Sequence, residues 1–84
     1  MMEQSEILKQ VSEFIEQNFV YDQEMSLNKD ESLLDSGLVD STGILEVVSF
    51  LEQTYAITVE DEEMVPDNLD SITKISNFIK RKIS

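Results

Sequence analysis

The chain has 84 residues, with no histidine and no cysteine, and its 18 acidic side chains outnumber 6 basic ones for a net charge of −12. The lack of histidine removes the usual general base and metal ligand, and the lack of cysteine removes disulfides, thiolate catalysis and cysteine-based zinc sites. So acidic a surface repels nucleic acid and anionic lipid.

Residues 3–18 are predicted to form the first helix, because apolar residues recur there at helical spacing. These apolar residues are Ile7, Leu8, Val11, Phe14 and Ile15. Residues 19–40 form a connection too long to be structureless in a compact domain, so we expect its apolar side chains to be held against the helices. They are Phe19, Val20, Met25, Leu27, Leu33, Leu34 and Leu38. A single helical turn is expected near Ser32–Leu34.

Residues 41–54 are predicted to form the second helix, with Asp40 as its N-cap. One apolar stripe runs along this segment and contains Ile44, Val47, Val48, Leu51 and Tyr55. A short third helix is expected at Asp61–Met64, before Pro66.

Residues 71–83 are predicted to form the last helix, with Asp70 or Ser71 as its cap. Its inward residues are Ile72, Ile75, Phe78, Ile79 and Ile83, and its final turn carries Lys80, Arg81 and Lys82, which suit the negative end of the helix dipole. The predicted fold is all-α: a small four-helix bundle of three main helices and one short helix. We expect a single domain over residues 1–84 and a monomer.

The negative charge is concentrated in the middle of the chain. Between Lys29 and Lys74 there are twelve acidic residues and no basic one. Such a surface is expected to steer the protein towards basic patches on partner proteins, although acidity can also simply keep a small protein soluble.

The segment Gly37–Gly43 presents Ser41 at the start of the second helix, directly after Asp40. A nucleophile elbow needs glycine two positions on either side of the serine, and Val39 occupies one of them. No histidine exists to complete a catalytic triad. The serine is therefore interpreted as a site to be modified, and the alternative is an ordinary serine in the first turn of a helix.

A calcium-binding EF-hand loop starting at Asp35 would place Glu46 at the twelfth position. It would also place Gly37 and Val39 at the third and fifth positions, where side-chain oxygens are required. Asp40 would occupy the position of the turn glycine. This spacing excludes the EF-hand, and no metal site is predicted.

A longer pattern surrounds the serine. It runs from Leu33-Leu34-Asp35-Ser36-Gly37-Leu38-Val39-Asp40-Ser41 to Glu46-Val47-Val48 and Leu51-Glu52, then Ile57-Thr58-Val59, then Leu69 and Ile72-Thr73-Lys74-Ile75. This pattern and the order of the elements resemble the acyl carrier protein family over about residues 5–82. The resemblance implies that Ser41 carries a 4′-phosphopantetheine arm, transferred from coenzyme A by a phosphopantetheinyl transferase that uses magnesium.

By the same resemblance, Asp40 would help to position the magnesium of the transferase. The residues implied to contact partners are Thr42, Leu45, Glu46 and Glu52. Physical chemistry supports the attachment site independently, because a phosphodiester is favoured at a helix N-terminus. The thiol of the arm would supply the nucleophile that a chain without cysteine lacks.

Thr42 and Gly43 depart from the usual fatty-acid pattern. Gly-Leu-Val-Asp-Ser-Thr-Gly is closer to stand-alone carriers that work with adenylating ligases, including the D-alanyl carrier type. Thr42 is expected to alter which partner reads the arm. We also expect Val47 and Leu51 to face the last helix and to line the space where an acyl chain could lodge.

The sequence therefore predicts a carrier that is not an enzyme. It would tether acyl or aminoacyl groups as thioesters and present them to an activating ligase and to downstream acyl-transfer enzymes, in fatty-acid or secondary-metabolite biosynthesis. The alternatives are a D-alanyl or aminoacyl carrier, a carrier-fold subunit that works unmodified, and a small acidic calcium or magnesium binder. No apolar run is long enough for a membrane span and no signal peptide is recognised, so a cytoplasmic location is expected.

Overall fold

The computed structural model describes residues 3–19 and 28–83, and in these ranges every regular element is a helix. The α-helices are α1 (Gln4–Phe19), α2 (Ser41–Tyr55), α3 (Pro66–Leu69) and α4 (Ile72–Ile83), with a 3₁₀ turn, η1 (Asp61–Glu63), between α2 and α3. The predicted bundle of three main helices and one short helix is confirmed. None of the helices in the described part of the chain is both long and apolar enough to cross a membrane. Val20, Met25 and Leu27 lie outside the described residues.

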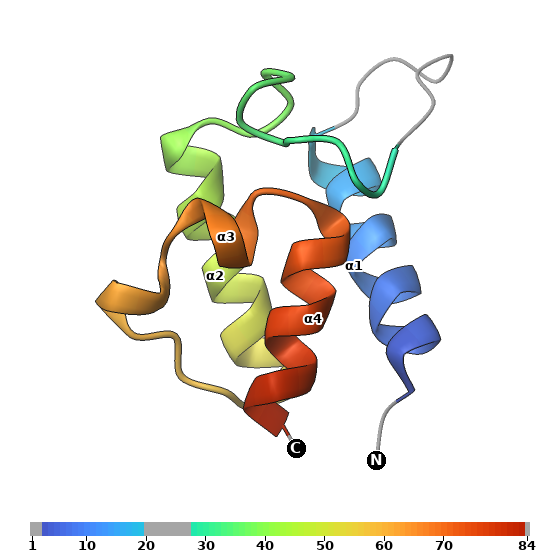
Figure 1. Cartoon of the computed structure of the whole chain (residues 1–84), viewed down its shortest axis with the longest axis vertical. Helices are drawn as coiled ribbons and strands as arrows, with labels where there is room; N and C mark the ends of the chain where they lie inside the picture. Colours follow the sequence, from blue (N-terminus) through green and yellow to red (C-terminus); the bar gives the residue numbers. More distant parts are fainter. Residues whose placement is uncertain (1–2, 20–27, 84) are drawn as a thin grey trace.

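The three main helices enclose one hydrophobic core. Figure 1 shows α1 running in the opposite direction to α2 and α4, so the last turn of α1 and the first turn of α2 lie at the same end of the molecule. The predicted apolar stripes face inward. The buried apolar side chains are Ile7, Val11, Ile15, Leu33, Val39, Val47, Val48, Leu51, Tyr55, Val59, Leu69, Ile72, Ile75, Phe78 and Ile79.

The connection before α2 is held by Leu33 and Val39, which are 2% and 1% exposed. The expectation for Leu33 is confirmed. The expectation for Leu34 is wrong, since that side chain is 38% exposed. Leu38 is only half-buried, because the chain turns at this point and places Val39 inward instead. Two residues therefore fix the approach to the second helix.

Asp70 clamps this connection from the far end of the sequence. Its backbone carbonyl accepts the N–H of Leu33 at 2.7 Å, and its carboxylate accepts the hydroxyl of Ser32 at 2.6 Å and the N–H of Leu34 at 3.0 Å. The cap of α4 is consequently Ser71, whose Oγ accepts the N–H of Lys74 at 3.0 Å. The expected turn near Ser32–Leu34 is present as a hydrogen-bonded turn and continues to residue 37.

The short helix lies later in the chain than predicted. Asp61–Glu63 forms only a 3₁₀ turn, and the short α-helix begins at Pro66. Proline suits the first position of a helix, because its φ is already close to the helical value and the N–H that it lacks would have no partner there. The prediction of a short helix at Asp61–Met64 was therefore wrong in position.

The 3₁₀ turn is tied to the last helix by one ion pair. Lys82 Nζ lies 2.9 Å from Glu63 Oε1, which also accepts the backbone N–H of Glu60 at 3.0 Å. The hydrogen bond from Glu60 and then the ammonium of Lys82 lower the pKa of the Glu63 carboxyl. The predicted basic last turn of α4 thus also helps to fasten the chain between α2 and α3.

Candidate functional site

Ser41 is the first residue of α2, and its side chain is exposed. The preceding Asp40 has extended backbone angles, φ −96° and ψ −177°, and its carboxylate accepts the N–H of Gly43 at 2.7 Å. Its carbonyl accepts the N–H of Ile44 at 3.0 Å. The predicted N-cap is confirmed, and it presents the serine hydroxyl outward at the positive end of a helix dipole.

A hollow of about 310 Å³ lies beside Ser41, where the end of α1 meets the start of α2. Its lining consists of Asn18, Phe19, Gly37, Leu38, Asp40, Thr42, Gly43 and Glu46. Only Asp40 and Glu46 among these carry a charge, and both are negative. The surface next to the serine therefore favours positively charged groups.

The predicted partner residues divide into two groups. Thr42 and Glu46 are exposed beside Ser41, and Leu45 is 59% exposed, a large value for a leucine. Glu52 is different because it is half-buried, and its carboxylate accepts the N–H of Val59 at 3.0 Å. The first three residues form an accessible face with Ser41, whereas Glu52 ties the end of α2 to the chain that follows it.

A small apolar hollow of about 70 Å³ lies between α2 and α3. It is lined by Leu34, Ile44, Met64, Val65, Pro66, Leu69 and Asp70. Val47 and Leu51 are both 0% exposed and belong to the packed core, as expected for residues facing the last helix. Neither residue lines the hollow between α2 and α3, so the expectation that Val47 and Leu51 line a space for an acyl chain does not hold for this hollow.

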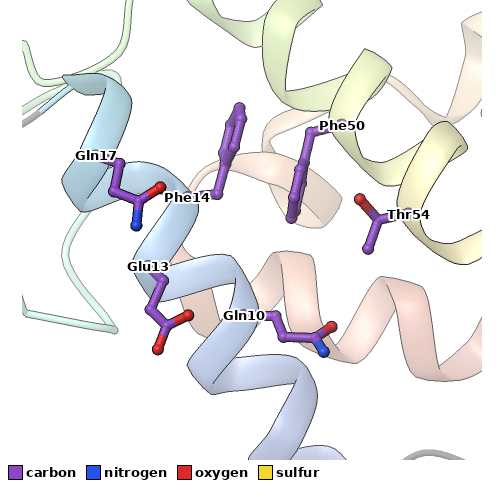
Figure 2. Close-up of a pocket in the computed structure, with 6 residues that line it drawn as sticks. All are labelled: Gln10, Glu13, Phe14, Gln17, Phe50 and Thr54. Carbon is purple, nitrogen blue, oxygen red and sulfur yellow. The ribbon is translucent and has the colours of Figure 1, made fainter.

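A third hollow, of about 250 Å³, lies on the surface between α1 and α2. Figure 2 shows the rings of Phe14 and Phe50 facing each other across the two helices; their centroids are 4.1 Å apart. The hydroxyl of Tyr55 donates to Gln10 Oε1 at 2.7 Å, and burial raises the pKa of Tyr55. Phe50 lies nine residues from Ser41, about 13 Å along the helix. This hollow is therefore separate from the serine.

Two residues that shape the site, Asp70 and Gly43, were not predicted from the sequence to have a role at Ser41. Asp70 is 36 or more residues away from the turn that it clamps, and only a three-dimensional structure brings them together. Gly43 is buried at the contact between α2 and Phe19. The sequence feature that could have pointed to Gly43 is a glycine within a helical pattern. Glycine lowers helix stability relative to alanine, so its presence there indicates a packing requirement.

No model of a known protein family matches the chain. Individual relatives do: the D-alanyl carrier proteins of Streptococcus pyogenes serotype M5 (strain Manfredo), serotype M49 (strain NZ131) and serotype M1 are each 38% identical to it over 53 residues. The matched residues are 63% of this chain and 67% of each relative. This similarity agrees with the helical bundle, and the chain belongs to the carrier protein family.

Proposed function

We propose that this carrier protein holds its cargo on a 4′-phosphopantetheine arm attached to Ser41. The observation that carries the proposal is the placement of an exposed serine at the first position of a capped helix, directly after Asp40. An enzyme that modifies the serine can reach it without displacing a core side chain. The chain itself would then act as a tether and not as an enzyme.

The local structure fits the phosphodiester of such an arm. Backbone N–H groups of the first turn and the helix dipole favour negative charge at this position. In the transfer, the Ser41 oxygen forms a bond to the phosphorus that bears the pantetheine, and the pyrophosphate P–O bond of coenzyme A breaks. Adenosine 3′,5′-bisphosphate leaves, and the serine proton passes to a base of the transferase. When bound, the arm supplies a terminal thiol for thioester formation.

We infer that the cargo is short, and an aminoacyl group such as D-alanyl is the candidate that the relatives' name supports. The apolar hollow between α2 and α3 holds only about 70 Å³. A hollow of this size offers too little room for a long acyl chain. The acidic surface beside Ser41 also suits the positively charged amino group of an aminoacyl thioester.

The expected partners are a magnesium-dependent phosphopantetheinyl transferase and an adenylating ligase that loads the thiol. Both must approach Ser41 across the accessible face formed by Thr42, Leu45 and Glu46. An exposed leucine beside carboxylates suits a partner with an apolar contact surrounded by basic residues. Asp40 stands next to the serine and is the carboxylate best placed to meet the magnesium of the transferase.

Intact-mass analysis tests the proposal. The purified chain is incubated with coenzyme A, magnesium and a broad-specificity transferase, and we expect the mass of one phosphopantetheine to be added. Ser41→Ala is expected to abolish the addition, and Ser36→Ala, which alters the neighbouring Asp-Ser pair, is expected to leave it intact. Addition to Ser41→Ala would disprove the site.

The cargo is tested separately on protein isolated from its own host. The same mass measurement, before and after cleavage of thioesters with hydroxylamine, is expected to show the loss of a small aminoacyl group. A long fatty-acyl group would contradict the inference of a short cargo while leaving Ser41 as the attachment site.

A further inference from the structure

Gly43 lies in a space too small for any side chain. A Cβ atom added to it would lie 2.9 Å from Phe19 Cε1 and 2.9 Å from Val39 Cγ1. Carbon atoms in good contact are about 3.5–4.0 Å apart, so one of these neighbours or the helix itself would have to move. The glycine thus allows the end of α1 and the connection to approach the first turn of α2 closely.

Both neighbours have little freedom to move. Phe19 packs edge-on against Phe14 with centroids 6.0 Å apart, and Phe14 stacks on Phe50, as Figure 2 shows. Val39 is 1% exposed, and its N–H donates to the carbonyl of Leu33 at 3.1 Å. A side chain at position 43 would therefore shift the start of α2 more readily than it would shift its surroundings.

The start of α2 is where Ser41 lies, two residues before the glycine. The N–H of Gly43 also holds the carboxylate of Asp40, so a shift at this position would disturb the cap together with the serine. Alanine is preferred to glycine by about 1 kcal/mol inside a helix, and local helix stability cannot explain the glycine. Its φ is not positive either, unlike that of Gly37, which is +77°.

We propose that Gly43 is a positioning residue for Ser41: by admitting Phe19 and Val39 it fixes the serine hydroxyl for transfer of the arm. This inference rests on the proposed modification of Ser41. The accessible face that includes Leu45 and Glu46 does not depend on the contact. A shift of the first turn should therefore slow the chemical step and leave docking of the transferase unchanged.

The test is the kinetics of arm addition by a transferase, measured on wild type, Gly43→Ala, Phe19→Leu and the double variant. For Gly43→Ala we expect kcat to fall roughly tenfold or more, as for other small displacements of a reacting group, with KM unchanged. Gln53→Ala, an exposed position on the same helix, is the matched control and should retain the wild-type kcat. Circular dichroism at the assay temperature reports whether each variant is folded.

The double variant separates positioning from a general loss of structure. Leucine at position 19 removes one of the two carbon atoms that the new methyl group would meet, and Val39 Cγ1 remains, so Gly43→Ala should still lower kcat in that background, but by less. An equal loss in both backgrounds, or an unchanged kcat in Gly43→Ala, would overturn the positioning role. If Gly43→Ala alone does not fold, the double variant is compared with Phe19→Leu, and an unchanged kcat would overturn it. A wild-type chain that gains no arm would instead refute the modification itself.

Discussion

Two of the chain's three Asp-Ser pairs lie only five residues apart, Asp35-Ser36 and Asp40-Ser41, and the third is Asp70-Ser71. In the first pair, the Ser36 hydroxyl donates to the carbonyl of Leu33 at 3.1 Å and stays within a turn. In the second pair, Ser41 begins a helix of 15 residues and its side chain is exposed. The same dipeptide therefore closes a turn in one place and opens a helix in the other.

The two carboxylates differ in the same way. Asp40 accepts the N–H of Gly43 and caps α2. Asp35 is exposed, and its contact with the turn is made through its backbone N–H, which donates to Ser32 Oγ at 3.0 Å. The helix that follows the dipeptide thus distinguishes Ser41 from Ser36. Ser71 also precedes a helix, but it is only 3% exposed and its hydroxyl caps α4, whereas Ser41 is exposed. Each prediction below contrasts a residue that matters in one region with a matched residue that does not.

The largest expected effect concerns Leu33, whose buried side chain anchors the turn that contains Asp35-Ser36. Leu33 is 2% exposed and Leu34 is 38% exposed, so the two neighbours differ in burial and not in chemistry. Leu33→Ala should lower the free energy of unfolding by about 2–4 kcal/mol, whereas Leu34→Ala should lower it by less than about 1 kcal/mol. Urea denaturation followed by circular dichroism measures both, and similar losses would show that Leu33 is not the anchor of the turn.

The next effect concerns the cap of the second pair. Asp40→Ala removes the acceptor for the N–H of Gly43 and should cost about 1 kcal/mol of stability, whereas Asp35→Ala should change it by less than about 0.5 kcal/mol. Asp40→Asn retains a capping oxygen without the charge. It should keep most of the stability and still slow arm addition if the carboxylate contributes to magnesium binding in the transferase. Full activity in Asp40→Asn would assign Asp40 to capping alone.

Much of this arrangement could be predicted from the sequence because it depends on local patterns. The apolar spacing of the first, second and last helices indicated their inward faces, and Asp40 before Ser41 indicated the start of α2. These features involve residues within a few positions of one another. The composition and the order of elements then sufficed to predict the helical bundle.

The features that could not be predicted depend on contacts between distant residues. Asp70 does not cap the start of α4, because its carboxylate is used by the turn at residues 32–34; it is instead the C-cap of α3. The carboxylate of Glu52 accepts the N–H of Val59, seven residues further along the chain, and the expected contact of Glu52 with a partner stays a prediction. The meeting of Gly43 with Phe19 depends on how α1 packs against α2. Pro66 is compatible with a helix start, and the sequence alone did not indicate that the short α-helix begins there.

The smallest expected effect tests whether partners approach the second pair through the face of α2. Glu46 lies beside Ser41, and Glu13 is an equally exposed carboxylate on α1. Both reversals, Glu46→Lys and Glu13→Lys, change the net charge equally. If a basic side chain of the ligase or transferase meets the hollow beside the serine, Glu46→Lys should lower kcat/KM for arm addition or loading roughly two- to fivefold more than Glu13→Lys. A difference of this size is the contribution of one exposed ion pair.

Raising the salt concentration should reduce the difference between Glu46→Lys and Glu13→Lys, because exposed charges are screened. Equal effects at the two positions would show that only net charge matters and that α2 is not the docking face, whereas a difference that persists at high salt would indicate a direct contact with Glu46 in place of long-range steering.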